Sequence, residues 1–140
     1  MKKSKYFFLG MVILVLSFGL VFAGCSNGST SKGGTIAPEF RGKWEVSKII
    51  YNSTTYILPV SINGFYIETQ GYEVGDTWAT AYRNGTMVES DTGLYSKGGS
   101  IYNSDGYTGA TLKRNGDKLI FNENNATAYC TKVTNFSWDL

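Results

Sequence analysis

The order of hydrophobic and polar positions divides the chain into three parts. Residues 1–24 begin with lysines and continue as an apolar run from Tyr6 to Ala23. Residues 25–38 are dominated by Gly, Ser and Thr, a composition typical of a flexible tether. From Glu39 onward short stretches alternate between hydrophobic and polar positions, so residues 39–140 are predicted to form one folded domain.

Alternating stretches in the third part predict β-strands because their side chains suit a pleated, half-buried surface. These stretches cover residues 44–47, 65–69, 78–82, 119–121 and 126–133. A further apolar stretch, residues 56–62, contains Pro59, which predicts an edge or bent strand because proline cannot donate to a sheet. No stretch beyond Pro38 has a helical stripe.

Asn-Gly pairs separate several of these stretches, at residues 63–64, 84–85 and 115–116. Both residue types tolerate the positive φ that tight hairpin turns require. Segments 81–88 and 112–119 have similar sequences around such a pair and are predicted to be two similar hairpins. The pattern therefore predicts an all-β fold, as a small antiparallel barrel or sandwich.

The first part of the chain has the layout of a secretory signal peptide. An N-terminal membrane helix is the alternative, because the apolar run is long enough to cross a bilayer. Ala23-Gly24-Cys25 resembles the lipobox of bacterial lipoproteins, and Phe22 is similar to the looser form found in spirochaetes. This resemblance implies cleavage before Cys25 and lipidation of the Cys25 sulfur, with palmitate among the attached chains.

The lipoprotein resemblance also implies a location. Acyl chains on Cys25 would hold the domain at a cell membrane, on its periplasmic or surface side. Ser26 stands where many inner-membrane lipoproteins have Asp, so the outer membrane is favoured. The membrane is thus the first partner that the sequence predicts.

Composition excludes several other classes of function. Three of the 13 basic residues lie in the leader and 11 residues are acidic, so the remaining chain is nearly neutral and nucleic acid is not expected as a partner. The chain has no histidine, the usual general base and a common zinc ligand. Cys130 is predicted to be a partly buried, unreactive thiol. No catalytic residue, metal ligand or cofactor is predicted.

Gly42-Lys43-Trp44 opens the first predicted strand, and a meander of strands follows to about residue 133. This arrangement resembles the short lipocalin-like domains carried by bacterial lipoproteins, in which a Gly-x-Trp motif begins the first strand. The resemblance implies an all-β, antiparallel up-and-down barrel behind an N-terminal hydrophobic signal helix. It also implies that Trp44 plugs the closed end and that Lys132, on the last strand, covers the plug.

The aromatic residues supply the candidate site. Trp44, Phe65, Trp78, Tyr82 and Phe121 are interpreted either as the lining of a cavity for a small hydrophobic ligand or as the filling of a solid barrel core. The second interpretation is favoured, because aromatic side chains of this size fill a small barrel.

Two carboxylate pairs, Glu73 with Asp76 and Glu89 with Asp91, have the residue type that glycoside hydrolysis needs. Both pairs lie beside glycine-rich segments and are predicted to be solvated turn residues. The chain is accordingly predicted not to be an enzyme.

Two functions remain. The first is a membrane-anchored lipoprotein whose non-enzymatic, lipocalin-like barrel takes a small hydrophobic ligand. The alternative is a protein-interaction module of the cell envelope, such as a protease inhibitor, an adhesin or a scaffold subunit. In that case exposed Tyr66, Tyr72, Tyr102 and Tyr107 are predicted to form the binding face.

Overall fold

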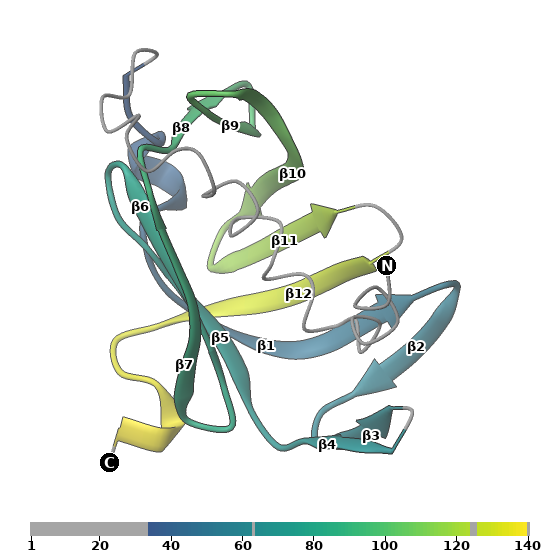
Figure 1. Ribbon diagram of the computed structural model, residues 1–140. Helices are drawn as coiled ribbons and strands as arrows, with labels where there is room; N and C mark the ends of the chain where they lie inside the picture. The colour runs from purple at the N-terminus through teal and green to yellow at the C-terminus, as the bar shows by residue number, and fades with distance from the viewer. Residues whose placement is uncertain (1–33, 63, 124–125, 140) are drawn as a thin grey trace.

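The computed structural model describes residues 34–62, 64–123 and 126–139, which form an antiparallel sheet curled into an open half-barrel (Figure 1). The prediction of an all-β fold is confirmed. The predicted signal helix and Cys25 lie outside the described residues. Among the described residues, no helix has the length and apolar character needed to span a membrane.

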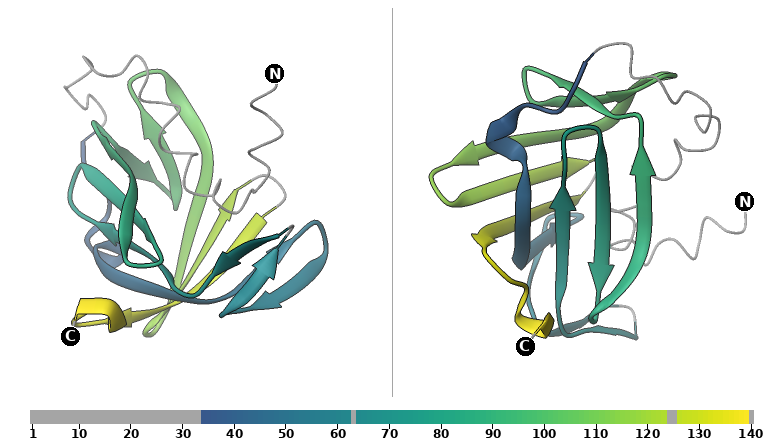
Figure 2. Two further views of the ribbon diagram at one scale, coloured as in Figure 1. Left: turned by 60° about the horizontal axis from the view of Figure 1, so that its bottom comes forward. Right: turned by 90° about the vertical axis from the view of Figure 1, so that its left-hand side faces the viewer.

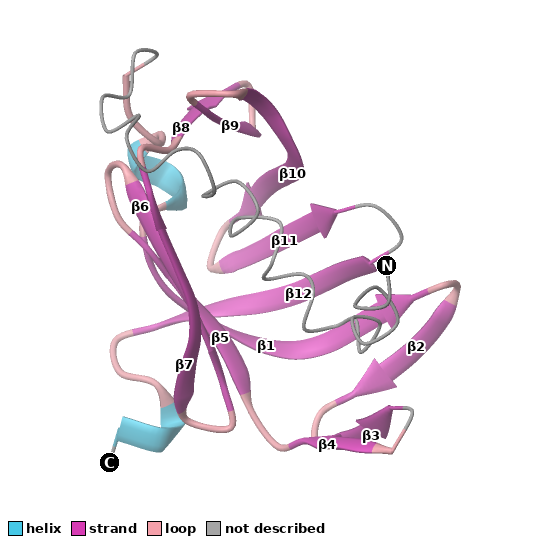
Figure 3. Ribbon diagram, viewed as in Figure 1, coloured by secondary structure: helices cyan, strands magenta, loops and turns pink. Residues whose placement is uncertain are grey.

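The described elements are short strands and two single-turn helices, coloured by type in Figure 3. In chain order they are η1 (Pro38–Phe40), β1 (Gly42–Tyr51), β2 (Thr54–Ile57), β3 (Val60–Ile62), β4 (Phe65–Ile67), β5 (Gln70–Val74), β6 (Trp78–Arg83), β7 (Thr86–Thr92), β8 (Tyr95–Lys97), β9 (Ser100–Asn103), β10 (Gly106–Asn115), β11 (Lys118–Glu123), β12 (Ala126–Val133) and η2 (Ser137–Asp139).

The main sheet has the strand order β7-β6-β5-β1-β12-β11-β10-β9-β8, with β2 paired to the second half of β1. Strands β3 and β4 form a separate hairpin. Because the last strand, β12, pairs with β1, the sheet curls back on itself, and its two arms diverge from β1 (Figure 2). Strands β7 and β8 follow one another in the chain but end the order at opposite edges, which leaves the barrel open.

The inner face of the sheet carries one large hydrophobic cluster. It contains Ile36, Phe40, Trp44, Val46, Ile49, Tyr72, Val74, Ala79, Ala81, Leu94, Ile101, Ala110, Leu112, Leu119, Phe121, Ala126, Ala128 and Cys130. A register shift between Val46 and Lys48 interrupts the alternation of β1, so Ile49 returns to the inner face after the bulge.

The folded domain begins before residue 39, which corrects the predicted boundary of the tether. Ile36 is fully buried in the main cluster, and its backbone N–H donates to the carbonyl of Asp76 over 2.7 Å. Ile36 is the one large apolar side chain between residues 26 and 38, and burying it removes hydrocarbon from water. The last residues of the predicted tether therefore belong to the domain.

The apolar stretch around Pro59 divides into β2 and β3, and both lie at the margin of the structure. This confirms the prediction of an edge or bent strand. Ile62 and Ile67 form a second, smaller cluster, against which Phe65 packs while half-buried.

The two similar segments do form two hairpins, but their turns differ. In the β6–β7 hairpin Arg83 pairs with Thr86, so Asn84 and Gly85 form the turn. In the β10–β11 hairpin Asn115 itself pairs with Lys118, so Gly116 and Asp117 form the turn. The same Asn-Gly pair thus closes the two hairpins in registers that differ by one residue.

Candidate functional site

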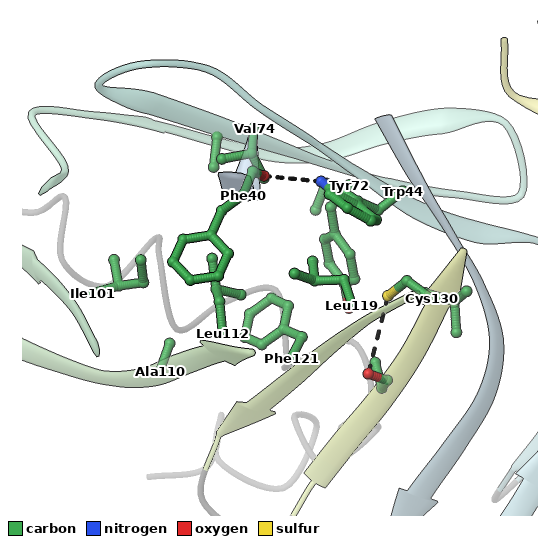
Figure 4. Close-up of a cluster of buried hydrophobic side chains, with 14 of the residues drawn as sticks. Phe40, Trp44, Tyr72, Val74, Ile101, Ala110, Leu112, Leu119, Phe121 and Cys130 are labelled. Carbon is green, nitrogen blue, oxygen red and sulfur yellow. Dashed lines mark hydrogen bonds between the residues drawn. The ribbon is translucent and has the colours of Figure 1, made fainter. Parts of the chain in front are cut away.

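Trp44 of β1 is fully buried, and Figure 4 shows its side chain hydrogen-bonded to Phe40 of η1. Its indole Nε1–H donates to the carbonyl oxygen of Phe40 over 2.9 Å. The guanidinium of Arg114 lies 5.5 Å from the centre of the Trp44 ring, and Lys132 Nζ lies 5.4 Å from it. We call Phe40, Trp44, Arg114 and Lys132 the Trp44 cap.

Register explains how Lys132 reaches the indole, since Trp44 on β1 pairs with Lys132 on β12. Gly42 has a φ of +126°, and a Cβ there would lie 2.8 Å from Cε of Lys132. The positive φ favours glycine at this position, and the Lys132 side chain passes close over it. Both cations gain from the negative face of the indole ring.

Beside the cap the interior is filled. The rings of Tyr72 and Phe121 are 4.9 Å apart at a tilt of 56°. Leu119 is 1% exposed and Cys130 is also 1% exposed, with its Sγ directed at the carbonyl of Ala128 over 4.0 Å. Burial raises the pKa of the Cys130 thiol, so it stays protonated and unreactive.

The inner face of β5, β6 and β7 differs from the apolar interior beside the Trp44 cap, because polar side chains lie there among small ones. We call Gln70, Arg83, Glu89 and Asp91 the polar wall. In register, Tyr72, Ala81 and Glu89 form one row across the three strands, and Val74, Ala79 and Asp91 form the next.

Gln70 is fully buried on β5, and its Nε2 donates to the hydroxyl of Tyr72 over 2.9 Å. Its Oε1 has no hydrogen-bond partner. Burial raises the pKa of Tyr72, so this hydroxyl stays neutral and accepts the bond.

Arg83 pairs with Gln70 in register, and its guanidinium lies 4.4 Å from the centre of the Phe65 ring. The Nη1 atom is buried without a hydrogen-bond partner. Burial lowers the pKa of Arg83, while the nearby Tyr72 hydroxyl opposes that shift. Burying a guanidinium N–H without an acceptor costs folding free energy, so an acceptor placed next to this atom would be bound favourably.

The prediction that Glu89 and Asp91 lie in a solvated turn is wrong. Both belong to β7 and face inward, opposite Ala81 and Ala79. Asp91 is 3% exposed, and neither carboxylate oxygen has a hydrogen-bond partner. Burial, together with the charge of Glu89, raises the pKa of Asp91 to about 8, and burial also raises the pKa of Glu89.

A bulge in β7 explains why alternation in the sequence does not predict that Glu89 and Asp91 face inward. The pairing between β6 and β7 shifts between Ala81 and Tyr82, leaving Val88 without a partner opposite it. Simple alternation from Thr86 therefore assigns the wrong face to everything after Val88. The outer face confirms the shifted register, because Ser90 lies 3.2 Å from Thr80, oxygen to oxygen.

The five predicted aromatic residues do not share one site. Trp44 and Phe121 lie in the main cluster, whereas Phe65 packs on the second cluster. Trp78 and Tyr82 face outward, because Ala79 and Ala81 face the core. The five residues therefore form neither a common cavity nor, as the favoured interpretation had it, one barrel core. The inward positions of β6 are alanines, which pair in register with Tyr72 and Val74 of β5.

Tyr82 instead joins a cluster on the outer face. Its ring lies 5.3 Å from that of Phe136 and 6.0 Å from that of Trp138, while Phe136 and Trp138 stack at 4.4 Å. The carboxylate of Glu45 accepts hydrogen bonds from the backbone N–H and the hydroxyl of Ser137. These contacts fasten the segment after β12 to the outside of the sheet.

Of the four tyrosines predicted to be exposed, only two are exposed. Tyr66 and Tyr107 are 54% exposed, but Tyr72 is buried in the core, which corrects that part of the prediction. The Tyr102 ring lies between those of Tyr95 and Tyr107, at 5.4 Å and 5.6 Å. Strands β8, β9 and β10 therefore carry a row of three tyrosines.

Within the described ranges, no three His, Cys, Asp or Glu side chains gather as a metal site. Glu73 and Asp76 do not join the polar wall, since Glu73 faces away from Tyr72 on β5 and Asp76 follows the strand. The chain matches no known protein family, no curated protein and no solved structure.

Proposed function

We propose that this chain is a membrane-anchored bacterial lipoprotein with a non-enzymatic, lipocalin-like ligand-binding domain. The leader, the lipobox-like end of the apolar run and the tether support the anchor. Lipidation of Cys25 would hold the domain on the periplasmic or surface side, at the outer membrane.

The lipocalin-like assignment is supported by the meander order and by the pairing of the last strand with the first. The Trp44 cap supports it further, since Lys132 lies over the indole of the Gly-x-Trp motif. In this assignment the open edge between β7 and β8 is the entrance to the interior.

The observation that carries the binding proposal is the set of unpartnered buried polar atoms on the polar wall. Gln70 Oε1 needs a donor and Arg83 Nη1 needs an acceptor, while the protonated Asp91 carboxyl can both donate and accept and has no partner. Leaving such atoms unpaired costs about 1–3 kcal/mol each. A small, largely hydrophobic molecule with one polar end would pair them while its apolar body packs against Tyr72 and Val74.

Native mass spectrometry of the full-length protein tests this proposal. The protein in an uncharged detergent would be exposed to a bacterial total lipid extract and then transferred to the gas phase. We expect a bound species on the wild-type protein and at least a tenfold smaller fraction on the Arg83→Leu and Gln70→Leu variants. Thr80→Val, on the outer face of the same strand, is the matched control and should bind as the wild type does.

A folded wild-type protein without any bound species would contradict ligand binding. Lipidation is tested separately by labelled palmitate, which we expect the wild type to incorporate and the Cys25→Ser variant to lack. Incorporation by that variant would contradict the assignment of Cys25.

The alternative, a protein-interaction module, rests on the tyrosine row. Tyr95, Tyr102 and Tyr107 present aromatic rings on the arm that ends the strand order at β8, and tyrosine is enriched in protein interfaces. Crosslinking in the cell envelope, from a photoreactive residue at position 107, would test it. A specific crosslinked partner, lost on Tyr102→Ala, would favour this function over small-molecule binding.

A further inference from the structure

The outer face of the sheet holds a groove of about 370 Å³ across β1, β12 and β11, away from the polar wall. Its floor is a register row in which Ile120 on β11, Tyr129 on β12 and Lys48 on β1 lie side by side. On the other side of Ile120 the same row ends with Lys113 of β10. In this row Ile120 and Tyr129 form an apolar floor, with Lys113 at one end and Lys48 at the other.

A third lysine enters the groove from the next row, where Lys118 pairs with Thr131. Lys118 Nζ donates to the hydroxyl of Thr131 over 3.1 Å. Lys48 Nζ lies 4.5 Å from the centre of the Tyr129 ring. The two ammonium groups therefore flank β12 from opposite sides, each held by a neutral partner from that strand.

These lysines have no carboxylate of their own within the described part of the chain. Glu45, the acidic residue of the Lys118 row, already accepts two hydrogen bonds from Ser137, at 2.9 Å and 2.6 Å. Asp117 lies in the turn beside Lys118 and is exposed. Two ammonium groups over an apolar floor, without paired acids, form a local positive field in an otherwise nearly neutral domain.

Charge is also unevenly distributed between the two arms of the sheet. The strands of the arm β1, β10, β11 and β12 carry six basic side chains: Lys43, Lys48, Lys113, Arg114, Lys118 and Lys132. Only Glu45 and Glu123 are acidic on those strands, whereas Glu73, Glu89 and Asp91 lie on β5 and β7. An anionic ligand is therefore steered toward the groove.

We propose that this groove binds the phosphate group of an anionic amphiphile, with Lys48 and Lys118 contacting the phosphate and Tyr129 and Ile120 contacting its apolar body. Ammonium groups form strong charge-assisted hydrogen bonds to phosphate oxygens. The Thr131 hydroxyl, already within reach of Lys118, supplies a further hydrogen-bonding group. The site is separate from the polar wall, so this inference does not depend on the proposed function.

The test is a titration of the full-length protein in micelles of an uncharged detergent, followed by NMR shifts of the Tyr129 and Thr131 amides. The probes are inorganic phosphate, dihexanoylphosphatidylglycerol and dihexanoylphosphatidylcholine. We expect the anionic lipid to shift both amides at low ionic strength and the zwitterionic lipid to bind at least tenfold more weakly. The Lys48→Glu/Lys118→Glu variant should lose at least tenfold in affinity for the anionic lipid.

Lys97→Glu is the matched control, because Lys97 Nζ also lies over a tyrosine ring, 5.2 Å from Tyr102, but outside the groove. Its affinity should stay within twofold of the wild type. If the Lys48→Glu/Lys118→Glu variant does not fold, the Lys48→Gln/Lys118→Gln variant, which adds no negative charge, replaces it in the same titration. Binding of inorganic phosphate as well would identify a site for the free anion, whereas binding of the anionic lipid alone would identify a headgroup site. Equal binding of both lipids, no shift by any anion, or equal losses in the Lys97 and Lys48/Lys118 variants would overturn the proposal.

Discussion

Two hairpins of this protein share the tripeptide Arg-Asn-Gly, at residues 83–85 and 114–116, yet they leave its arginine in different states. Both guanidinium groups lie over an aromatic ring, Arg83 over Phe65 and Arg114 over Trp44. Arg114 Nη1 donates to the carbonyl of Glu39 over 2.8 Å, whereas Arg83 Nη1 is buried without a partner.

The asparagines differ as much as the arginines. Asn84 occupies the turn with a φ of +54°, and its Oδ1 accepts from the backbone N–H of Glu68 over 2.6 Å. Asn115 is the last residue of a strand. The asparagine of the shared tripeptide therefore holds the β6–β7 turn to the neighbouring segment at Asn84, but only ends a strand at Asn115.

Hydrogen-bond satisfaction separates a structural site from a candidate binding site in this protein. The Trp44 cap is complete: its indole N–H and its arginine both have acceptors within the chain. The polar wall is incomplete at Gln70, Arg83 and Asp91.

The largest expected effect is the loss of stability on truncating the aromatic ring beneath each arginine. Trp44→Ala should lower the free energy of unfolding by about 3–5 kcal/mol, because it empties a fully buried site. Phe65→Ala should cost about 1 kcal/mol, since Phe65 is only half-buried. Urea unfolding followed by circular dichroism measures both, and similar losses would remove the contrast.

The next effect is the pH dependence of stability caused by Asp91. Its folded pKa, about 8, lies above the ordinary value of 3.8, so the folded chain holds a proton that the unfolded chain has released between these values. The free energy of unfolding should therefore fall as pH rises from 4 toward 8. Urea midpoints between pH 5 and 8 measure it, and Asp91→Asn should flatten the slope.

Glu89→Gln is the matched control for that measurement. It removes the neighbouring negative charge, the smaller cause of the Asp91 shift, and should leave most of the slope in place. A wild-type midpoint that does not change with pH would show that Asp91 gains a partner in solution.

A smaller effect separates the two asparagines. Asn84→Ala should cost about 2 kcal/mol, because it removes side-chain hydrogen bonds to Glu68 and Tyr66 and leaves a positive φ. Asn115→Ala should change the free energy of unfolding by less than about 0.5 kcal/mol. Equal costs in a urea titration would argue that both hairpins close in the same register.

The smallest effect compares the arginines themselves in ligand-free protein. Arg114→Leu should cost about 1 kcal/mol more than Arg83→Leu, since Arg114 loses bonds to Glu39 and Gly116 while Arg83 loses an unsatisfied buried donor. Thermal unfolding of both variants measures the difference. A larger cost at Arg83 would mean that its Nη1 is satisfied in solution.

Much of the fold could be predicted from local sequence. Alternation located the strands around Trp44 and Trp78, Pro59 marked a break between β2 and β3, and Gly42 placed the strand start beside Trp44. Each depends on preferences that a few neighbouring residues fix, such as side-chain period and allowed φ.

The candidate site could be predicted less well. Trp44 and Phe121 were correctly assigned to the interior, but Trp78 and Tyr82 face outward and Asp91 faces inward. Choosing between the two faces of β6 requires knowing what fills the other side of the sheet. Predicting which face of β7 carries the Asp91 side chain requires knowing that this strand has a bulge at Val88.

Local sequence is enough to predict which segments are extended and where most turns lie, and it excludes histidine chemistry. Tertiary structure decided which face of each strand is buried, because a one-residue change of register or a single bulge moves every later side chain to the opposite face. It also decided which of the two Arg-Asn-Gly turns keeps an unpaired guanidinium N–H. That outcome depends on acceptors such as the Glu39 carbonyl, which lies 75 positions from Arg114 in the chain.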